Sequence, residues 1–295
     1  MNRMTWCRRV AVVGLVVAAA SVVVAGVRAD VGARAGTGAR AEVGAANVIV
    51  HLVEAISPAT PFAKSVTAWC PSGMKVYSAG GALRDWSGQV VIDAVRPLPD
   101  LSGVVVSARP LSDRPAWVLV AHAVCAYGNP VLVRSNEFGA LVDAKEHSVS
   151  CPVPGSLTGV TGEVVGADPD DPAALYGLVP DESLTTATAK ASGPADASWT
   201  VQAYAICDKE KAGSLVREVV KIPMSGELEQ EATATCAEGY AYTGGGATAY
   251  GNTGDALTVG LVWLPNPEAG SMTGVGTKGA SPWGIEAYAI CFKKG

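Results

Sequence analysis

The sequence predicts an all-β protein made of three tandem repeats, each closed by its own disulfide. A nine-residue phrase from tryptophan to cysteine occurs three times, as WVLVAHAVC at 117–125, WTVQAYAIC at 199–207 and WGIEAYAIC at 283–291. Six cysteines fall into pairs of nearly constant separation, and 34 glycines and 18 prolines punctuate short apolar runs. Self-similarity at a fixed period, with many short strands and turns, indicates a β repeat architecture.

The first 29 residues are typical of an export signal peptide. Arg3, Arg8 and Arg9 precede an apolar run over 10–27, and VRA at 27–29 has small residues at the two cleavage-recognition positions. The apolar run is 18 residues long, so an uncleaved membrane anchor is the alternative, and only then would the membrane be a partner. The arginine pair leaves general and twin-arginine export both open. Either route predicts a secreted, extracellular protein.

Residues 30–48 are rich in alanine and glycine without an apolar period, which predicts a flexible linker. Without the signal, the chain keeps 18 of its 22 Lys and Arg against 27 Asp and Glu, a net charge of −9. This acidic balance argues against nucleic acid and anionic membrane surfaces as partners.

The repeats span residues 49–127, 128–209 and 210–295. Six cysteines allow 15 pairings in principle, but the separations of 55, 56 and 55 residues favour one bridge inside each repeat. On the chain-entropy model, a loop of this length stabilises the fold by about 4 kcal/mol per bridge. The predicted bridges are Cys70–Cys125, Cys151–Cys207 and Cys236–Cys291.

The elements of each repeat follow one order. A turn and a glycine-rich strand follow the first cysteine, as in CPSGMKVYSAGGA from 70, CPVPGSLTGVTGE from 151 and CAEGYAYTGGGAT from 236. An apolar run ending at proline comes next, at 90–97, 175–180 and 257–265. The closing phrase has the two-residue period of a strand, with tryptophan, alanines and cysteine on one face. Glycine in a strand allows another backbone to come close, so we expect the glycine strand to pack on that alanine face.

These motifs carry a resemblance. Cys70-Pro71-Ser72-Gly73, the glycine run and Trp-x-Val-x-Ala-Tyr-Ala-x-Cys at 199–207 resemble modules of secreted actinobacterial proteins of unassigned function and of some tail-fibre-like tips. Three such modules also resemble, in outline, the β-prism proteins, whose three sheets surround a pseudo-threefold axis. The resemblance implies a β-prism-like arrangement and supplies no catalytic or ligand residues. The second repeat departs with VP at 153–154 before Gly155, and the third has Ala237 in place of the proline.

Familiar catalytic and cofactor motifs do not fit this sequence. GVGTKG at 274–279 precedes a predicted strand and opens no helix, so we expect a hairpin connection and no bound cofactor. His122 stands where the other repeats have Tyr204 and Tyr288, which indicates a half-buried ring with a polar tip. The three histidines lack the spacing of a metal site, and the bridged cysteines leave no thiol nucleophile. We therefore predict no catalytic residue and no metal.

A binding site is expected where the repeats differ. The candidate residues are Trp263, Trp86 and Tyr250, whose rings could stack on a sugar or a protein partner. Trp263 lies in the apolar run before a proline, where the first repeat has Arg96 and the second Val179. Packing of an edge strand is the alternative role for that tryptophan.

The sequence favours a non-enzymatic extracellular binding or structural protein, with a cell-wall glycan, another carbohydrate or an extracellular protein as its partner. The alternative is a secreted hydrolase, with glycans as a candidate substrate class, that uses paired carboxylates such as Asp181 with Glu182 or Glu229 with Glu231. Such chemistry needs two carboxyl groups about 5 to 10 Å apart in a cleft. A shallow surface without such a pair favours binding.

Overall fold

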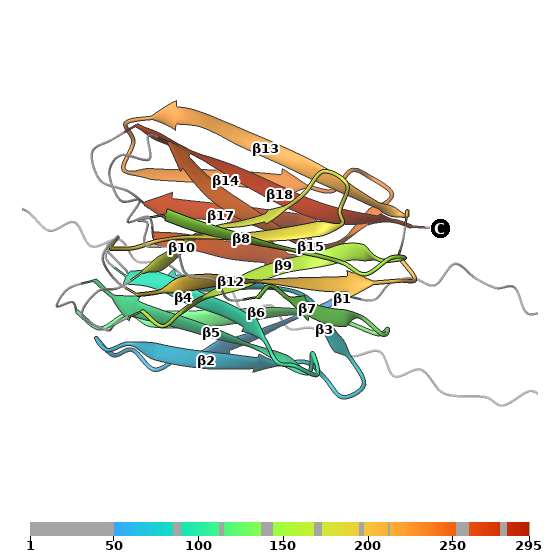
Figure 1. Cartoon of the computed structure of the whole chain (residues 1–295), viewed down its shortest axis with the longest axis horizontal. Coiled ribbons are helices and arrows are strands. Elements are labelled where there is room, and N and C mark those ends of the chain that lie inside the picture. Colours follow the sequence, from blue (N-terminus) through green and yellow to red (C-terminus); the bar gives the residue numbers. More distant parts are fainter. Residues whose placement is uncertain are drawn as a thin grey trace, which may run out of the picture. The chain divides into compact units, whose positions relative to one another are not determined.

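The computed structural model describes residues 50–84, 90–111, 115–136, 144–167, 173–194, 198–211, 213–251, 260–277 and 282–294. Within these residues the secondary structure consists of 18 β-strands without a helix, so the predicted all-β class is confirmed (Figure 1). The predicted signal peptide, the whole predicted linker and Trp86 lie outside the described residues.

Each predicted repeat contributes six strands. The first contributes β1 (Val50–Ile56), β2 (Lys64–Trp69), β3 (Lys75–Arg84), β4 (Val90–Pro97), β5 (Gly103–Pro110) and β6 (Val118–Ala126). The second contributes β7 (Val131–Arg134), β8 (Ala144–Ser150), β9 (Ser156–Val165), β10 (Ala174–Pro180), β11 (Thr186–Ser192) and β12 (Thr200–Asp208). The third contributes β13 (Leu215–Ser225), β14 (Glu229–Thr235), β15 (Tyr240–Gly251), β16 (Gly260–Asn266), β17 (Ser271–Thr277) and β18 (Trp283–Lys293).

The strands form three six-stranded sheets with one shared plan. Sheet 1 has the order β1-β6-β3-β16-β17-β14, sheet 2 the order β2-β5-β4-β9-β12-β7, and sheet 3 the order β13-β18-β15-β10-β11-β8. Every sheet joins the first, sixth and third strands of one repeat to the fourth, fifth and second strands of another. The plan is that of a three-fold, prism-like arrangement, as the sequence predicts.

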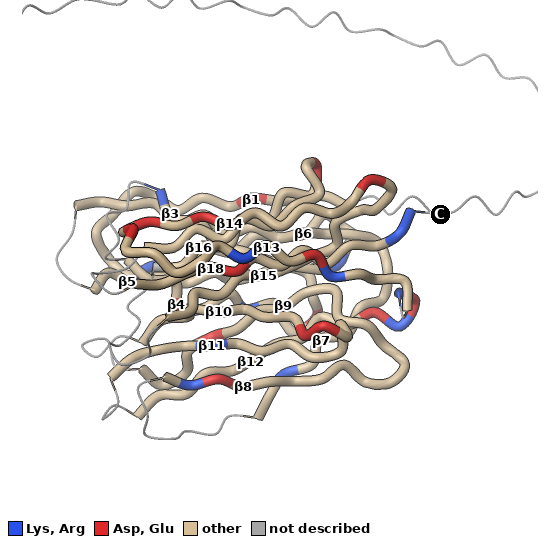
Figure 2. Tube along the Cα trace, turned by 90° about the horizontal axis from the view of Figure 1, so that it is seen from above, with Lys and Arg blue, Asp and Glu red and all other residues tan. Residues whose placement is uncertain are grey.

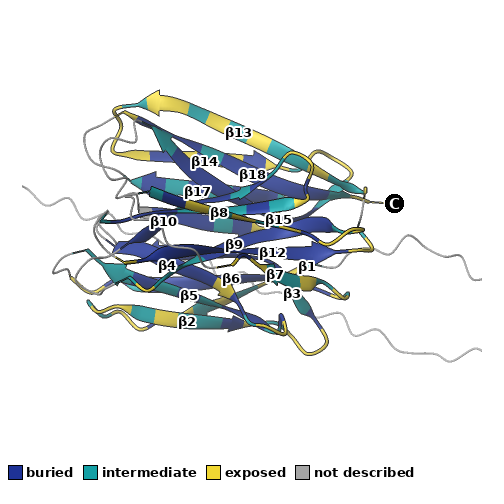
Figure 3. Cartoon of the chain, in the orientation of Figure 1, coloured by how far each residue is buried: buried dark blue, intermediate teal, exposed yellow. Residues whose placement is uncertain are grey.

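The repeats are interlocked by pairing between the third strand of one and the fourth strand of another. The registers at these three joins are Gly81–Trp263, Val95–Gly162 and Gly177–Thr248. Repeat 1 is thereby joined to repeat 2, repeat 2 to repeat 3 and repeat 3 back to repeat 1. One hydrophobic core runs through all three repeats, and the strands at the sheet edges, such as β2 and β13, carry most of the exposed positions (Figure 3).

The disulfides connect sheets within each repeat. The three predicted bridges are confirmed as Cys70–Cys125, Cys151–Cys207 and Cys236–Cys291. The first cysteine of each pair directly follows the second strand of its repeat, and the second cysteine lies in or at the end of the sixth strand. Because those two strands belong to different sheets, the bridges link sheet 2 to sheet 1, sheet 3 to sheet 2 and sheet 1 to sheet 3.

The glycine strands allow a close approach, although not the expected one. β15 lies beside β18 in the same sheet, with Gly245 opposite Ala289, so the glycine strand is paired to the closing strand and not packed on its face. The close contacts are to other repeats: a Cβ at Gly244 would overlap the carbonyl oxygen of Thr158, and one at Gly159 would overlap that of Tyr77. Glycine is required because the third strands of the repeats, β3, β9 and β15, contact one another.

The tryptophan of each closing phrase is buried, and its carbonyl oxygen is satisfied by a neighbouring strand. Lys64 Nζ donates to the carbonyl oxygen of Trp117 at 2.7 Å, and Lys145 Nζ donates to that of Trp199. The third repeat uses an amide instead, since Gln230 Nε2 donates to the carbonyl oxygen of Trp283. These three polar residues each stand six positions before the first cysteine of their repeat.

Candidate functional site

The structure contradicts the predicted role of Trp263. Its side chain is completely buried, and its indole Nε1 donates to the carbonyl oxygen of Ala247 at 3.1 Å. The counterparts Arg96 and Val179 are wrong by one residue: alignment on the proline that ends each run places Trp263 opposite Val95 and Leu178, which are also completely buried. The tryptophan is therefore a core residue and offers no face to a ligand.

Tyr250, the second predicted ligand residue, makes its contacts with β13. Tyr250 is half-buried; its hydroxyl donates to the carbonyl oxygen of Ile222 at 2.6 Å, and Lys221 Nζ lies 4.2 Å from the centre of its ring. One face of that ring is therefore covered by a cation. Trp86 lies outside the described residues, so its role stays a prediction.

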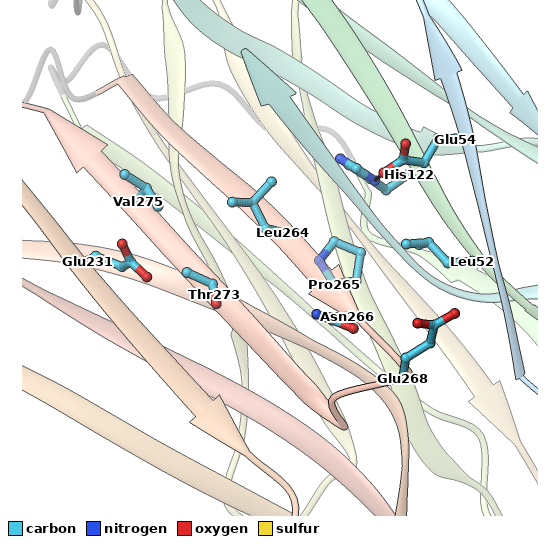
Figure 4. Close-up of a pocket in the computed structure, with 10 residues that line it drawn as sticks. All are labelled: Leu52, Glu54, His122, Glu231, Leu264, Pro265, Asn266, Glu268, Thr273 and Val275. Carbon is cyan, nitrogen blue, oxygen red and sulfur yellow. Dashed lines mark ion pairs between the residues drawn. The ribbon is translucent and has the colours of Figure 1, made fainter. Parts of the chain in front are cut away.

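A concave site occurs elsewhere, on the outer face of sheet 1. It is a hollow of about 470 Å³ over β1, β6, β14, β16, β17 and the turn after β16 (Figure 4). Its lining combines three carboxylates, one imidazole, two polar side chains and four apolar ones. The lining residues are Leu52, Glu54, His122, Glu231, Leu264, Pro265, Asn266, Glu268, Thr273 and Val275.

Two features form the hollow: the join between repeats 1 and 3, and the small imidazole ring of His122. Pro265 lies over Gly80 of β3, where a Cβ would meet the proline Cδ at only 2.7 Å, so glycine lets the two strands come together beneath the site. His122 is the counterpart of Tyr204 and Tyr288, and an imidazole is shorter than a phenol. The shorter ring leaves open space that a tyrosine would fill.

His122 is buried beside one carboxylate. Its Nδ1 lies 3.2 Å from Glu54 Oε1, and only 6% of its side chain is exposed, compared with 41% for Glu54. Burial lowers the pKa of His122, Arg84 lowers it further by charge repulsion, and Glu54 opposes the decrease. The ring is therefore neutral at pH 7 and has one donor and one acceptor nitrogen. Both Nδ1 and Nε2 are buried, and neither has a hydrogen-bond partner among the described residues.

On the outer faces of the other two sheets, acidic side chains are paired with basic ones. On sheet 2, Arg96 Nε lies 3.1 Å from Glu163 Oε2, and the hydroxyl of Tyr204 also donates to Glu163. On sheet 3, Lys221 Nζ lies 3.6 Å from Glu286 Oε2. By contrast, the residues that line the hollow include no lysine or arginine, and Figure 2 shows acidic positions on both β1 and β14.

The carboxylate pairs proposed for hydrolysis are only partly compatible with the structure. Asp181 Oδ1 accepts hydrogen bonds from the backbone N–H groups of Thr185 and Thr186, each at 2.7 Å. Although partial burial opposes it, hydrogen bonding from Ser183 and from these neighbours lowers the pKa of Asp181. An anion stabilised in a turn is a poor general acid. Glu231 does line the hollow, but Glu229 is not among its lining residues.

Other chemistries find no support in the described part of the chain. No group of three or more His, Cys, Asp or Glu side chains there is arranged to hold a metal ion. All six cysteines of the described ranges are in disulfides and cannot act as thiolate nucleophiles. The described residues also hold no helix of the length and hydrophobicity that crossing a membrane requires.

Comparison with known proteins gives no family assignment. Neither a protein-family model nor a curated protein matches the chain. The resemblance to secreted actinobacterial modules stays a prediction, and the functional argument depends on the hollow itself.

Proposed function

We propose that this protein is a non-enzymatic binding protein of the extracellular space and that it holds its ligand in the hollow of sheet 1. Three disulfides inside one chain are typical of proteins that work in an oxidising, extracellular environment. The observation that carries the proposal is a concave site whose lining combines three carboxylates with apolar side chains and contains no lysine or arginine.

The construction of the site favours binding over catalysis. Most of its lining residues stand on strands in a continuous sheet, so the site is held in place by backbone hydrogen bonding and by the core beneath. Preformed concave surfaces with a few polar groups among apolar ones are characteristic of ligand sites. The hydrolase alternative would need two of the carboxylates Glu54, Glu231 and Glu268 to act on one bond.

A retention assay tests the proposal. The exported protein is immobilised and exposed to cell-wall polysaccharides and to envelope extracts, beside the variant His122→Tyr, which puts the ring of the other repeats into the hollow. Glu146→Gln is the matched control, because Glu146 holds on β8 the place that Glu231 holds on β14. We expect a retained component that His122→Tyr loses and the control keeps.

Two results would contradict the proposal. If the wild-type protein and His122→Tyr retain the same components equally, the hollow is not the binding site. If incubation with polysaccharide produces new reducing ends that Glu231→Gln abolishes, the hydrolase alternative is correct.

A further inference from the structure

Three aromatic side chains of the described residues are more than half exposed, and all three belong to repeat 1. They are Phe62, Trp69 and Tyr127, with exposed fractions of 73%, 59% and 64%. Phe62 precedes β2 and Tyr127 follows β6, whereas Trp69 is the last residue of β2, at the edge of sheet 2 (Figure 1). Successive side chains of a strand point to opposite faces, and Ala68 is completely buried, so Trp69 stands on the outer face of the sheet.

The other two repeats have hydroxyl residues where repeat 1 has this tryptophan. Trp69 faces Gly103 of β5 in register. At the same place, each of the other repeats has two facing hydroxyl residues, and these pairs are Ser150 with Thr186 on sheet 3 and Thr235 with Ser271 on sheet 1. A Cβ at Gly103 would lie only 3.2 Å from Cε3 of Trp69, so the glycine lets the indole lie against the backbone of β5. The tryptophan and the glycine therefore replace a polar pair together.

A third change makes the same place apolar. Leu98 directly follows the proline that ends β4, and a Cβ at the glycine would lie 3.4 Å from its Cδ1. The counterparts of Leu98 are Asp181 and Asn266, whose side-chain oxygens accept hydrogen bonds from backbone N–H groups of their turns. In repeat 1 the acceptor is instead Asp100, which bonds the backbone N–H two residues further on at 3.1 Å. The three positions that differ together form the Trp69 platform, which consists of Trp69, Gly103 and Leu98.

Hydrogen-bonding groups border the platform. Thr67 stands on the same face of β2, two residues before the indole and so about 7 Å away along the strand. Ser65 comes next, and its Oγ lies 2.7 Å from Oγ of Ser107 on β5. At the other end of the platform, the turn between β4 and β5 exposes Asp100, and Lys75 Nζ donates to the backbone carbonyl of that residue at 2.8 Å. The border therefore offers hydroxyl groups and one carboxylate, whose charge a lysine compensates.

We propose that the Trp69 platform binds an uncharged glycan, with one sugar ring stacked on the indole and its hydroxyl groups bonded to Thr67 and Asp100. The C–H bonds of a sugar ring are slightly positive and pack well on the negative face of an aromatic ring. A sugar hydroxyl both donates and accepts, so it suits a carboxylate and a threonine alike. The platform is on sheet 2, so it is a second site beyond the hollow of sheet 1 and does not depend on the proposed function.

The size and the charge of the platform favour a glycan over a protein partner. A stable protein interface needs about 800 Å² from each partner. A large aromatic side chain supplies about 150–250 Å², and the apolar neighbours of the ring on this face, Leu98 and Val105, are themselves half-buried. Lys75 compensates Asp100, so the described border has no excess charge to attract a polyanion or a basic peptide.

Titration with neutral oligosaccharides tests the inference. The probes are cellohexaose, mannohexaose and hexa-N-acetylchitohexaose, added to the oxidised protein and followed by NMR. We expect at least one of them to bind saturably. Trp69→Ser, which introduces the residue of the second repeat, should weaken that binding at least about tenfold, because loss of a central aromatic side chain removes much of the contact energy. Trp69→Tyr keeps an aromatic ring and should retain most of the affinity.

Two control variants separate this site from other surfaces. Phe62→Ser removes an equally exposed ring before the start of β2, and it should leave the affinity unchanged. His122→Tyr fills the hollow of sheet 1 and should also leave it unchanged.

Each other outcome contradicts the inference in a recognisable way. No saturable binding of any of the three oligosaccharides, or binding that Trp69→Ser leaves unchanged, would show that the platform does not bind an uncharged glycan. If His122→Tyr abolishes the binding and Trp69→Ser does not, the hollow is the sugar site, so the proposed function stands and the inference on the platform is wrong. A dimer in analytical ultracentrifugation that Trp69→Ser dissociates would assign the platform to a second copy of the chain.

Discussion

His122 shows how a single residue separates one face of the molecule from the other two. The repeated phrase puts this histidine at the position of Tyr204 and Tyr288 and predicts a half-buried ring, whereas all three rings are buried. It could not predict the hollow, because Glu54 comes from another strand of the same repeat, and Glu231 and Leu264 come from a different repeat. The structure brings these segments together through the join between β3 and β16.

Burial of His122 predicts a stability that depends on pH. Its lowered pKa means that the unfolded chain binds a proton more readily than the folded protein does. Stability should therefore fall as the pH decreases below the ordinary histidine value of about 6.5. We expect the melting temperature of the wild type to decrease more between pH 7.5 and 5 than that of His122→Tyr. Circular dichroism at several pH values measures both melting temperatures. Parallel curves for the two proteins would contradict the assignment.

A second feature of single residues is present in the sequence, but its chemical pattern does not reveal it. Lys64, Lys145 and Gln230 stand at one offset from the first cysteine, and all three donate to the carbonyl of the repeated tryptophan. The signal was hidden because the chemical types differ, two amines and one amide, although the hydrogen bond is the same.

Exchange of Lys145 tests this hydrogen bond. Lys145→Met removes the donor and leaves the buried carbonyl of Trp199 without it, which should destabilise the fold by about 1–3 kcal/mol. Lys145→Gln introduces the residue that the third repeat uses and should restore most of that loss. Urea denaturation measures both variants. Equal stability of the two variants would show that the hydrogen bond to the carbonyl of Trp199 does not stabilise the fold.

At the scale of strands, the sequence predicted the elements well and their contacts less well. The period of two in the closing phrase and the glycine run after the first cysteine both correspond to strands in every repeat. The prediction that the glycine strand packs on the alanine face of the closing strand is wrong. A local glycine pattern indicates that another backbone comes close, but it does not identify that backbone. The ligand role predicted for Trp263 is wrong for the same reason: a large aromatic residue in an apolar run is equally compatible with a core and with an exposed edge.

The contact among the third strands predicts an intolerance to side chains. Gly244→Ala would place a methyl group onto the carbonyl oxygen of Thr158, and we expect a loss of about 2–4 kcal/mol or failure to fold. Gly226→Ala is the control, since a Cβ there would meet no atom within 4 Å and its φ is not positive. Thermal denaturation compares the two. A well-folded Gly244→Ala protein with wild-type stability would refute the close approach.

For the whole molecule, the repeat count and the bridges could be predicted from the sequence, and the interlocking could not. The constant cysteine separation predicts one bridge within each repeat, and the three disulfides of the structure confirm it. The sharing of every sheet between two repeats depends on pairs such as Gly81 with Trp263, which are far apart in the chain and carry no local signal. The hollow itself depends on this sharing, since its lining comes from repeats 1 and 3.

Differential scanning calorimetry of the oxidised protein tests whether the three sheets form one interlocked ring. Because each sheet needs strands from two repeats, we predict one cooperative transition whose van't Hoff enthalpy equals the calorimetric enthalpy, about 0.7 kcal/mol per residue of the folded unit. Three separable transitions, or a van't Hoff enthalpy near one third of the calorimetric value, would show that the repeats fold as independent units and are not interlocked.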